Sequence, residues 1–242
     1  MFKFPSSMRK RFFRARDRVI IRHTPYGAYV LDPRDQLDLN MAAGRVPERN
    51  TFAELRRRLA EAKPDLFLDI GSNFGLYAVL AGTMGVKEIH AFEPVRRKFD
   101  QICGSIAANR FSDRARAHHM ALGEEEGVAI MHLVPGLSAV SRFEDATEGA
   151  VWDFTERQEV RVAALDDLFD WSGRRAFVKI DVEGAESMVL TGMEKFLQNN
   201  VVDMQIEVFP QNRDHVYALM ERFGYGKTGQ VADDHYFASP KR

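Results

Sequence analysis

Residues 66–76 read Leu-Phe-Leu-Asp-Ile-Gly-Ser-Asn-Phe-Gly-Leu. This pattern predicts an apolar strand that runs into a glycine-rich turn and then into a helix. Glycine permits positive φ and close approach of the backbone to a ligand, so Gly71 and Gly75 favour a tight turn around a bound molecule. Asn73 is the next best residue for a left-handed conformation, and Asp69 ends the strand beside the loop. The same pattern also fits an ordinary strand–helix turn of an α/β protein.

Strands and helices alternate along the rest of the chain. Strands separated by long helices pair in parallel, because the connecting chain must cross back over the sheet. We therefore expect an α/β fold with helices on both faces of a mostly parallel sheet. The expected strands are 18–22, 28–31, 66–70, 88–92, 115–122, 128–133, 159–163, 176–182, 201–209 and 236–237, and the expected helices are 76–82, 95–109, 185–198, 212–223 and one that begins near residue 51.

The composition is that of a globular protein. Of 242 residues, 45% are hydrophobic, and the net charge is only -1, which excludes a mainly disordered chain. Cys103 is the single cysteine, which excludes a disulfide scaffold and a cysteine-based zinc cluster. The sequence has no run of eighteen apolar residues and no apolar segment of signal-peptide type at its start, so we expect a cytoplasmic protein.

The charges are distributed unevenly. Residues 1–24 hold eight basic residues against one acid, a net charge of +7, so the rest of the chain carries -8. Phenylalanine and methionine are interleaved with these basic residues, at Phe2, Phe4, Met8, Phe12 and Phe13. Such a segment fits peripheral contact with an anionic membrane, and equally a first helix whose aromatic side chains cover the core. We expect no nucleic-acid partner, because the rest of the chain offers no basic track.

The glycine loop does not fit a dinucleotide. The dinucleotide fingerprint places glycines at its first, third and sixth positions, which here are Gly71, Asn73 and Leu76. The acid at the base of the loop would also repel a pyrophosphate. A cationic ligand fits better, and S-adenosylmethionine carries both a sulfonium and an amino group.

An acid and an apolar strand end complete the expected nucleoside site. Glu93 follows the strand 88–92 and lies twenty-odd residues after Asp69, where a carboxylate accepts the ribose hydroxyls of an adenosine. A helix-capping role for Glu93 is the alternative. The strand that ends near Ala121 is expected to lie over the adenine.

Residues 177–186 read Phe-Val-Lys-Ile-Asp-Val-Glu-Gly-Ala-Glu and hold the candidate catalytic groups. Alternation places Lys179, Asp181 and Glu183 on one face of a strand whose other face is apolar. Buried strands rarely hold several charges unless these are paired or functional, so a structural ion pair is the alternative. Glu207 ends the next strand and brings a further acid to the carboxyl edge of the sheet, where α/β proteins bind ligands. Glu186 lies in the first turn of a helix, where an acid is favoured in any protein.

Together these motifs resemble the FkbM family of methyltransferases, over about residues 50 to 225. The resemblance implies a class I, Rossmann-like, S-adenosylmethionine-dependent methyltransferase fold, with a mostly parallel seven-stranded sheet that has one antiparallel edge strand. It also implies O-methylation of a hydroxyl on a sugar, a glycan, a lipo-oligosaccharide or a natural product. In size and layout the chain is similar to rhizobial enzymes of nodulation-factor synthesis that 2-O-methylate fucose. We accordingly divide the chain into a basic extension with short strands, 1–49, and a methyltransferase domain, 50–242, in which the insert 134–157 with Trp152 and Phe154 is the expected acceptor lid.

The expected chemistry is removal of the acceptor's proton by Asp181 or Glu183. An aspartate with a pKa of about 3.9 is a weak base for a sugar hydroxyl. Asp181 therefore needs burial to raise its pKa, or a divalent metal to acidify the hydroxyl. Mg²⁺ prefers oxygen ligands, and its candidate ligands are Asp181, Glu183 and Glu207. A histidine base is the remaining alternative, at His119, His132, His215 or His235.

Other function classes stay open. A non-sugar small molecule is the alternative acceptor. An NAD(P)-dependent oxidoreductase is the rival enzyme class, although the third glycine and a Tyr-x-x-x-Lys pair are absent from the sequence. A non-catalytic glycan-binding protein on the same fold is the third class. No motif in the sequence specifies an oligomeric state.

Overall fold

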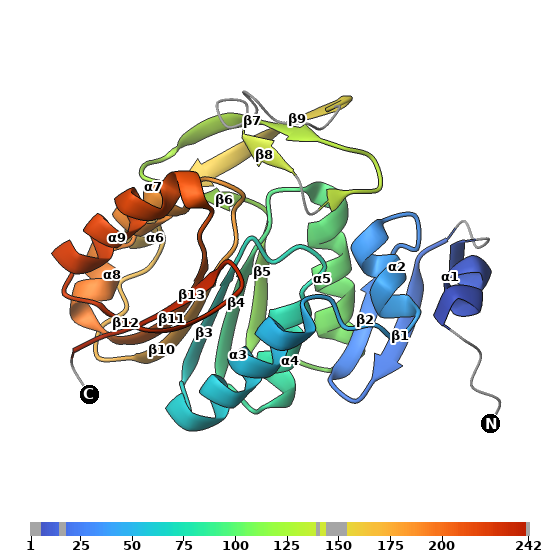
Figure 1. Ribbon diagram of the computed structural model, residues 1–242, viewed down its shortest axis with the longest axis horizontal. Coiled ribbons are helices and arrows are strands. Elements are labelled where there is room, and N and C mark those ends of the chain that lie inside the picture. The colour runs from blue at the N-terminus through green and yellow to red at the C-terminus, as the bar shows by residue number, and fades with distance from the viewer. Residues whose placement is uncertain (1–5, 15–17, 139–140, 144–153, 241–242) are drawn as a thin grey trace.

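A computed structural model describes residues 6–14, 18–138, 141–143 and 154–240, with the side chains of Ser6 and Arg14 excepted (Figure 1). Its helices are α1 Ser6–Arg14, α2 Gln36–Ala42, α3 Arg49–Ala62, α4 Leu76–Thr83, α5 Arg96–Ala108, α6 Leu165–Leu168, α7 Glu186–Thr191, α8 Glu194–Asn199 and α9 Arg213–Arg222, with a 3₁₀ helix at Pro210–Asn212. Its strands are β1 Ile20–Thr24, β2 Gly27–Leu31, β3 Leu66–Ile70, β4 Glu88–Phe92, β5 Ala115–His118, β6 Ala121–Leu122, β7 Gly127–Leu133, β8 Arg142–Phe143, β9 Glu156–Ala163, β10 Arg175–Ile180, β11 Val201–Glu207, β12 Gly226–Val231 and β13 Asp234–Ala238.

The central sheet has seven strands within the described residues, in the order β12-β13-β11-β10-β3-β4-β5. Strands β11, β10, β3, β4 and β5 pair in parallel, whereas β13 pairs antiparallel with both β11 and β12. The predicted α/β class is confirmed, with a mixed sheet. The predicted position of the antiparallel strand is wrong, because β13 lies one place inside the edge.

Helices cover both faces of this sheet, as predicted. On β3, Phe67 packs with α3, α4 and α5 on one face, while Leu68 and Ile70 pack with α7, α8 and α9 on the other. Every residue of β3 is buried, as expected for a central strand covered on both faces. Each buried large apolar side chain contributes roughly 1.5–3 kcal/mol relative to exposure. The sheet therefore supplies a rigid base from which the strand ends project.

A smaller sheet, with the order β6-β9-β7-β8, lies across the carboxyl end of the central sheet (Figure 1). Residues 115–122 were expected to form one strand, but they divide into β5 and β6. The chain leaves the central sheet where the N–H of Glu93 donates to the carbonyl of His118, and Ala121 then pairs with β9. This second sheet closes the space above β3 and β4.

Residues 20–48, here called the N-terminal unit, pack against the same core. Tyr29 and Leu31 of β2 are fully buried in the cluster that contains α4 and α5. Helix α5 also bonds to the edge of β2, because Asn109 accepts the N–H of Ala28 at 2.8 Å and Ser105 accepts the N–H of Val30 at 2.9 Å. The division at residue 49 stays a prediction, and side chains from both sides of it share one core.

Several other elements differ from expectation, among them helices α2 and α6 and strand β8, which were not predicted. The single helix predicted at 185–198 is broken into α7 and α8 around Gly192. A Cβ atom at Gly192 would lie 1.9 Å from the carbonyl oxygen of Gly123, so close backbone contact explains the break. Strand β12 was not predicted, because Gly-Lys-Thr-Gly-Gln-Val has no alternating apolar pattern. Among the described residues, no helix combines the length and apolarity needed to span a bilayer.

A buried ion pair joins the N-terminal unit to α5. Lys98 is 1% exposed, and its Nζ donates to Oδ1 of Asp38 on α2 at 2.7 Å. Nζ also lies 3.5 Å from Asp35. Because both charges of the Lys98–Asp38 pair are withdrawn from water, each depends on the other.

We predict that Lys98→Met lowers the free energy of unfolding by about 3–5 kcal/mol, because Asp38 is left buried without its cation. The double variant Lys98→Met/Asp38→Asn should recover a large part of that loss. Exposed Lys87 provides the matched control, and Lys87→Met should change stability by less than about 0.5 kcal/mol. Urea denaturation measures the free energy of unfolding of all three variants. If Lys98→Met were as stable as wild type, the Lys98–Asp38 pair would not hold the N-terminal unit to α5.

Candidate active site

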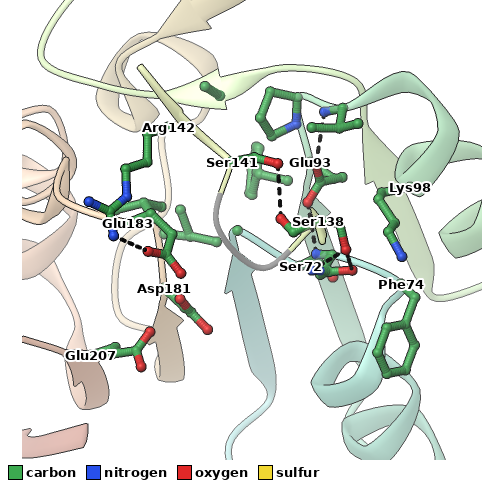
Figure 2. A pocket seen from close by; sticks show the side chains of 18 of the residues that line it. Ser72, Phe74, Glu93, Lys98, Ser138, Ser141, Arg142, Asp181, Glu183 and Glu207 are labelled. Carbon is green, nitrogen blue, oxygen red and sulfur yellow. Dashed lines mark hydrogen bonds and ion pairs between the residues drawn. The ribbon is translucent and has the colours of Figure 1, made fainter. Parts of the chain in front are cut away.

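A cavity of about 370 Å³ lies at the carboxyl ends of β3, β4, β10 and β11 (Figure 2). This volume falls in the range of small-molecule sites, which open at this edge in α/β proteins. The walls come from the loop after β3, from β4, from the acidic ends of β10 and β11, from the second sheet and from the N-terminal unit.

The loop after β3 forms one wall of the cavity. Gly71 has φ 78°, and a Cβ atom there would lie 1.7 Å from the carbonyl oxygen of Asp181. Only glycine permits this contact, which joins the loop to the end of β10. Asn73 has φ 51°, the left-handed conformation that its residue type predicted. Both Gly71 and Asn73 line the cavity.

Asp69 lies behind the loop and does not line the cavity. It is 1% exposed and accepts the hydroxyl of Ser72 at 2.7 Å and the N–H of Ala78 at 2.8 Å. Burial raises the pKa of Asp69 to about 6. Gly75 is also absent from the lining, and it precedes α4 with φ 85°, packed against Ile102. The structure therefore places Asp69 and Gly75 where they shape the loop from outside the cavity.

Glu93 lies on the cavity wall beside the loop. Its carboxylate accepts the N–H of Asn73 at 2.7 Å and the N–H of Val95 at 2.8 Å. Burial raises the pKa of Glu93 to about 7. Ala121 also lines the cavity, so the structure brings together Gly71, Asn73, Glu93 and Ala121 of the predicted cofactor residues.

The base of the predicted insert lies against this loop. The side-chain amide of Asn73 donates to Oγ of Ser138 at 3.2 Å, and the N–H of Ser138 donates to Asp35 at 2.9 Å. Ser138, Ser141 and Arg142 line the cavity (Figure 2). Phe154 packs edge-on against His132, away from the lining, and Trp152 lies outside the described residues. The lid function of residues 134–157 stays a prediction.

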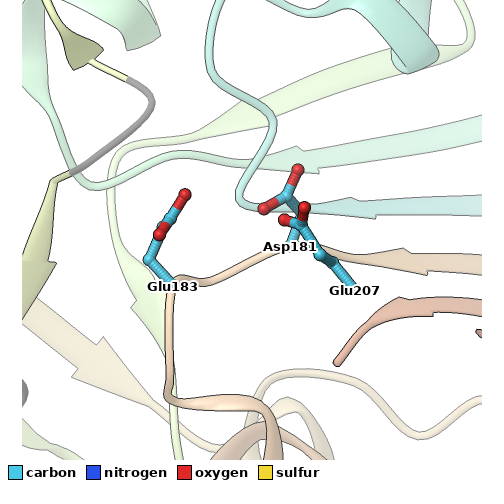
Figure 3. A group of neighbouring side chains, drawn as sticks. All are labelled: Asp181, Glu183 and Glu207. Atoms are coloured by element: carbon cyan, nitrogen blue, oxygen red, sulfur yellow. The ribbon is translucent and has the colours of Figure 1, made fainter. Parts of the chain in front are cut away.

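Asp181, Glu183 and Glu207 form an acid cluster on the opposite wall (Figure 3). One carboxylate oxygen from each lies within 4.8 Å of the others. The sequence predicted this convergence, because β10 and β11 are parallel neighbours that end at the same edge of the sheet.

The buried ammonium of Lys179 lies beneath the acid cluster. Lys179 is 1% exposed, and its Nζ lies 3.4 Å from Asp181 and 3.1 Å from Asp234 of β13. Burial disfavours its charge, but the carboxylates of Asp181 and Asp234 outweigh burial and raise the pKa of Lys179. The structure thus contains the ion pair considered above, and it lies directly under the cavity.

Asp181 and Glu207 have opposite protonation tendencies. Burial disfavours the charge of Asp181, but the ammonium of Lys179 and a hydrogen bond with Glu207 outweigh it and lower its pKa. Burial and the charge of Asp181 raise the pKa of Glu207 to about 10. Of the two routes considered for activating Asp181, burial therefore does not prevail, because Lys179 and Glu207 lower its pKa by more than burial raises it. Asp181 is the anion of the pair, and Glu207 holds the proton.

Glu183 has a pKa that suits a base. Burial and the neighbouring charge of Asp181 raise the pKa of Glu183 to about 8. Its residue adopts φ 53°, a strained conformation for a non-glycine residue, and such strain is concentrated at functional sites. Arg142 of β8 reaches across the cavity, and its guanidinium donates to Oε2 of Glu183 at 3.2 Å.

The remaining candidates lie elsewhere. Glu186 accepts the N–H of Gly184 at 2.8 Å and the amide of Asn212 at 2.9 Å, which is a structural role at the start of α7. None of the four histidines considered as bases is among the described lining residues, and these are His119, His132, His215 and His235.

Sequence reasoning missed several lining residues, among them Tyr77, Glu48 and Arg142. Tyr77 follows the glycine loop on α4, and its hydroxyl donates to Glu48 at 3.0 Å. Glu48 comes from the N-terminal unit, for which the motifs assigned no site residue. Arg142 lies in the insert, where no spacing rule indicated its partner Glu183. Of these three, only Tyr77 had a usable signal, because it directly continues the loop motif.

The FkbM methyltransferase domain model matches residues 69–226. No curated protein matches the sequence. Among solved structures, methyltransferase FkbM from Methylobacillus flagellatus KT is 19% identical with a TM-score of 0.50, and the alignment covers 71% of this chain and 42% of that chain. The precorrin-6y C5,15-methyltransferase of Geobacter metallireducens is 13% identical with a TM-score of 0.45, covering 80% and 88% of the two chains.

The structural likeness to the Methylobacillus protein shows a shared fold, and the domain match covers well over half of the chain. That match includes the glycine loop, Glu93, Lys179 and the whole acid cluster. The chain therefore belongs to the FkbM family of methyltransferases.

Proposed function

We propose that the protein is an S-adenosylmethionine-dependent O-methyltransferase that acts on a hydroxyl of a sugar. The observation that carries the proposal is a single cavity with a nucleoside-type wall, Gly71 to Asn73 with Glu93, facing an acid cluster that includes a base of suitable pKa. Membership of the FkbM family supports the transfer of a methyl group. The choice of a sugar acceptor rests on the resemblance of the motifs and on the polar lining described below.

The lining fits a cationic nucleoside cofactor. Glu93 and the acid cluster give the cavity acidic walls, whereas Phe92 and Leu122 add apolar surface for a base. We propose that Glu93 accepts the ribose hydroxyls, and that the backbone from Gly71 to Asn73 lies along the amino-acid end of the cofactor. The two N–H groups that bind the carboxylate of Glu93 hold it in place before a ligand arrives. When bound, S-adenosylmethionine would supply an electrophilic methyl group, whose bond to sulfur breaks on transfer with the electron pair left on sulfur, so that the thioether S-adenosylhomocysteine is the leaving group.

Two carboxylates of the acid cluster have different roles toward the acceptor. We propose that the Asp181 carboxylate, held by Lys179, accepts a hydrogen bond from an acceptor hydroxyl and orients it. Glu183 takes the proton of the reacting hydroxyl onto its carboxylate as the acceptor oxygen forms its new bond to carbon. A pKa of about 8 makes Glu183 a far better proton acceptor near neutral pH than an ordinary carboxylate.

Magnesium is the alternative occupant of the acid cluster. The three carboxylates lie close enough together to ligate it, and oxygen ligands suit it. However, Lys179 already neutralises Asp181, Arg142 pairs with Glu183, and Glu207 retains its proton. We therefore propose that the protein's own cations perform the charge neutralisation that a metal supplies in other enzymes.

Polar groups on the cavity rim favour a sugar over an apolar acceptor. The cavity is lined by Ser141, which precedes β8, by Arg142 of β8, by Glu48 of the N-terminal unit and by Tyr77. Such a mixture of donors and acceptors matches the several hydroxyls of a sugar ring.

We predict that incubation with isotopically methyl-labelled S-adenosylmethionine labels a carbohydrate in a panel of free and lipid-linked oligosaccharides. Labelling should be equal in Mg²⁺ and in EDTA, because Lys179 and Arg142 provide the positive charge. Loss of labelling in EDTA would assign the acid cluster to a metal. Labelling of a phenolic panel but of no carbohydrate would move the acceptor to another class of alcohol.

We predict that kcat rises with pH through about 8 as Glu183 loses its proton. This rise is the limb of the pH profile that Glu183 controls. In Arg142→Gln the limb should move to higher pH, because the lost cation no longer favours the charged form of Glu183. Glu183→Gln should lower kcat by roughly 10²–10⁴-fold and remove the limb. Arg161, an exposed arginine paired with Glu126, provides the control, and Arg161→Gln should keep the wild-type profile. A limb that persists in Glu183→Gln would transfer the role of base to another group.

A further inference from the structure

Exposed apolar side chains are concentrated at the N-terminal end of the structure. Of the six large hydrophobic residues exposed among the described residues, four fall between residues 8 and 21, where Met8, Phe12, Val19 and Ile21 are 48% to 58% exposed. We group them with the exposed Arg11 and Arg18, according to their position in the sequence and their exposure, and call this group the N-terminal patch. Single exposed apolar residues are ordinary, whereas a cluster of them signals an interaction surface.

The helix α1 presents one side of this patch. Met8 and Phe12 are four residues apart, so they lie on the same face of the helix. Phe13 packs against the main core and edge-on against Phe12, with ring centroids 5.3 Å apart, while α1 itself lies beside α2 (Figure 1). Helix α1 is therefore anchored through Phe13, whereas the side chains of Met8 and Phe12 are each 54% exposed.

The strand β1 continues the patch. Ile20 packs against the core, whereas Val19 and Ile21 are exposed, as alternation along an extended chain requires. Within the described residues β1 pairs only with β2, in a separate two-stranded sheet. Among the residues that the structure describes, none covers the outward side chains of Val19 and Ile21 completely, and these are 48% and 58% exposed.

Charge identifies the kind of surface that the patch fits. Residues 1–24 carry +7, whereas the rest of the chain carries -8. An anionic bilayer would attract this end of the molecule and repel the remainder, which also fixes the direction of approach. Apolar side chains flanked by Arg and Lys match the boundary between headgroups and acyl chains. A nucleic-acid backbone, in contrast, is charged and offers no apolar surface for exposed Val and Ile. We propose that the N-terminal patch docks the protein onto an anionic lipid bilayer.

The N-terminal unit, which includes Ile21 of the patch, also contributes Leu37, Pro47 and Glu48 to the cavity lining. The segment that docks is therefore continuous in sequence with one wall of the cavity. The docking proposal stands independently of the methyl transfer, because it rests on different residues.

Sedimentation with large unilamellar vesicles tests the proposal on the full chain. Wild type should bind vesicles containing roughly 30% phosphatidylglycerol, and binding should weaken steeply with added salt and disappear on pure phosphatidylcholine. Arg11→Glu/Arg18→Glu should weaken binding by at least about tenfold, because each basic residue near an anionic surface contributes about fivefold. Phe12→Ser/Ile21→Ser should weaken it by at least about fivefold, through lost apolar insertion.

Two exposed residues outside the patch supply matched controls. Lys87→Glu changes the charge as Arg11→Glu does, and Val128→Ser removes an apolar side chain that is 66% exposed. Both controls should bind vesicles as wild type does, and circular dichroism should show every variant folded. Equal binding by the patch variants and the controls would overturn the proposal. Binding of single-stranded RNA without binding of vesicles would overturn it too.

Labelling of a water-soluble acceptor should be the same in patch variants and wild type, so failure to dock and failure to methylate are separate outcomes.

Discussion

The cavity chemistry depends on one buried positive charge. Lys179 is held under the ends of the central strands by Asp181 and Asp234, and it fixes which carboxyl groups are ionised. With this ammonium in place, Asp181 is an anion, and its charge raises the pKa values of both Glu207 and Glu183. Without it, the acid cluster would bring several carboxylates together, with Arg142 as the remaining cation paired to them among the described residues. A single lysine therefore stabilises the acidic wall of the cavity and, through Asp181, gives Glu183 a pKa suited to proton transfer.

A backbone contact joins this charged wall to the nucleoside wall. Gly71 passes so close to the carbonyl of Asp181 that any side chain would collide with it. Both segments follow neighbouring parallel strands, β3 and β10, whose pairing continues up to Ile70 and Ile180. The distance between the two halves of the cavity is thus set by the sheet itself rather than by flexible loops, and such rigidity is what an aligned group transfer requires.

Local motifs predicted the parts of the site that belong to the sheet. Gly71, Asn73, Glu93, Asp181, Glu183 and Glu207 follow strands or lie in tight turns, where spacing and residue type limit the arrangement, and all line the cavity. Asp69 lies outside the cavity lining because Ser72 of the loop and the N–H of Ala78 on α4 bind its carboxylate, which strand alternation does not reveal. Glu48 and Arg142 were missed because tertiary packing alone brings their segments to the cavity. The broken helix at Gly192 has the same origin, since the contact with Gly123 is distant in sequence.

Calorimetric titration with S-adenosylmethionine tests the central claim, that this crevice holds a sulfonium nucleoside against Glu93. We predict that wild type binds S-adenosylmethionine but not NADPH, and that Glu93→Ala weakens binding by at least about tenfold, or about 1.4 kcal/mol. Glu125→Ala, at an exposed site, should bind as wild type does. Heat on titration with NADPH and none with S-adenosylmethionine, or undiminished binding by Glu93→Ala, would contradict the account.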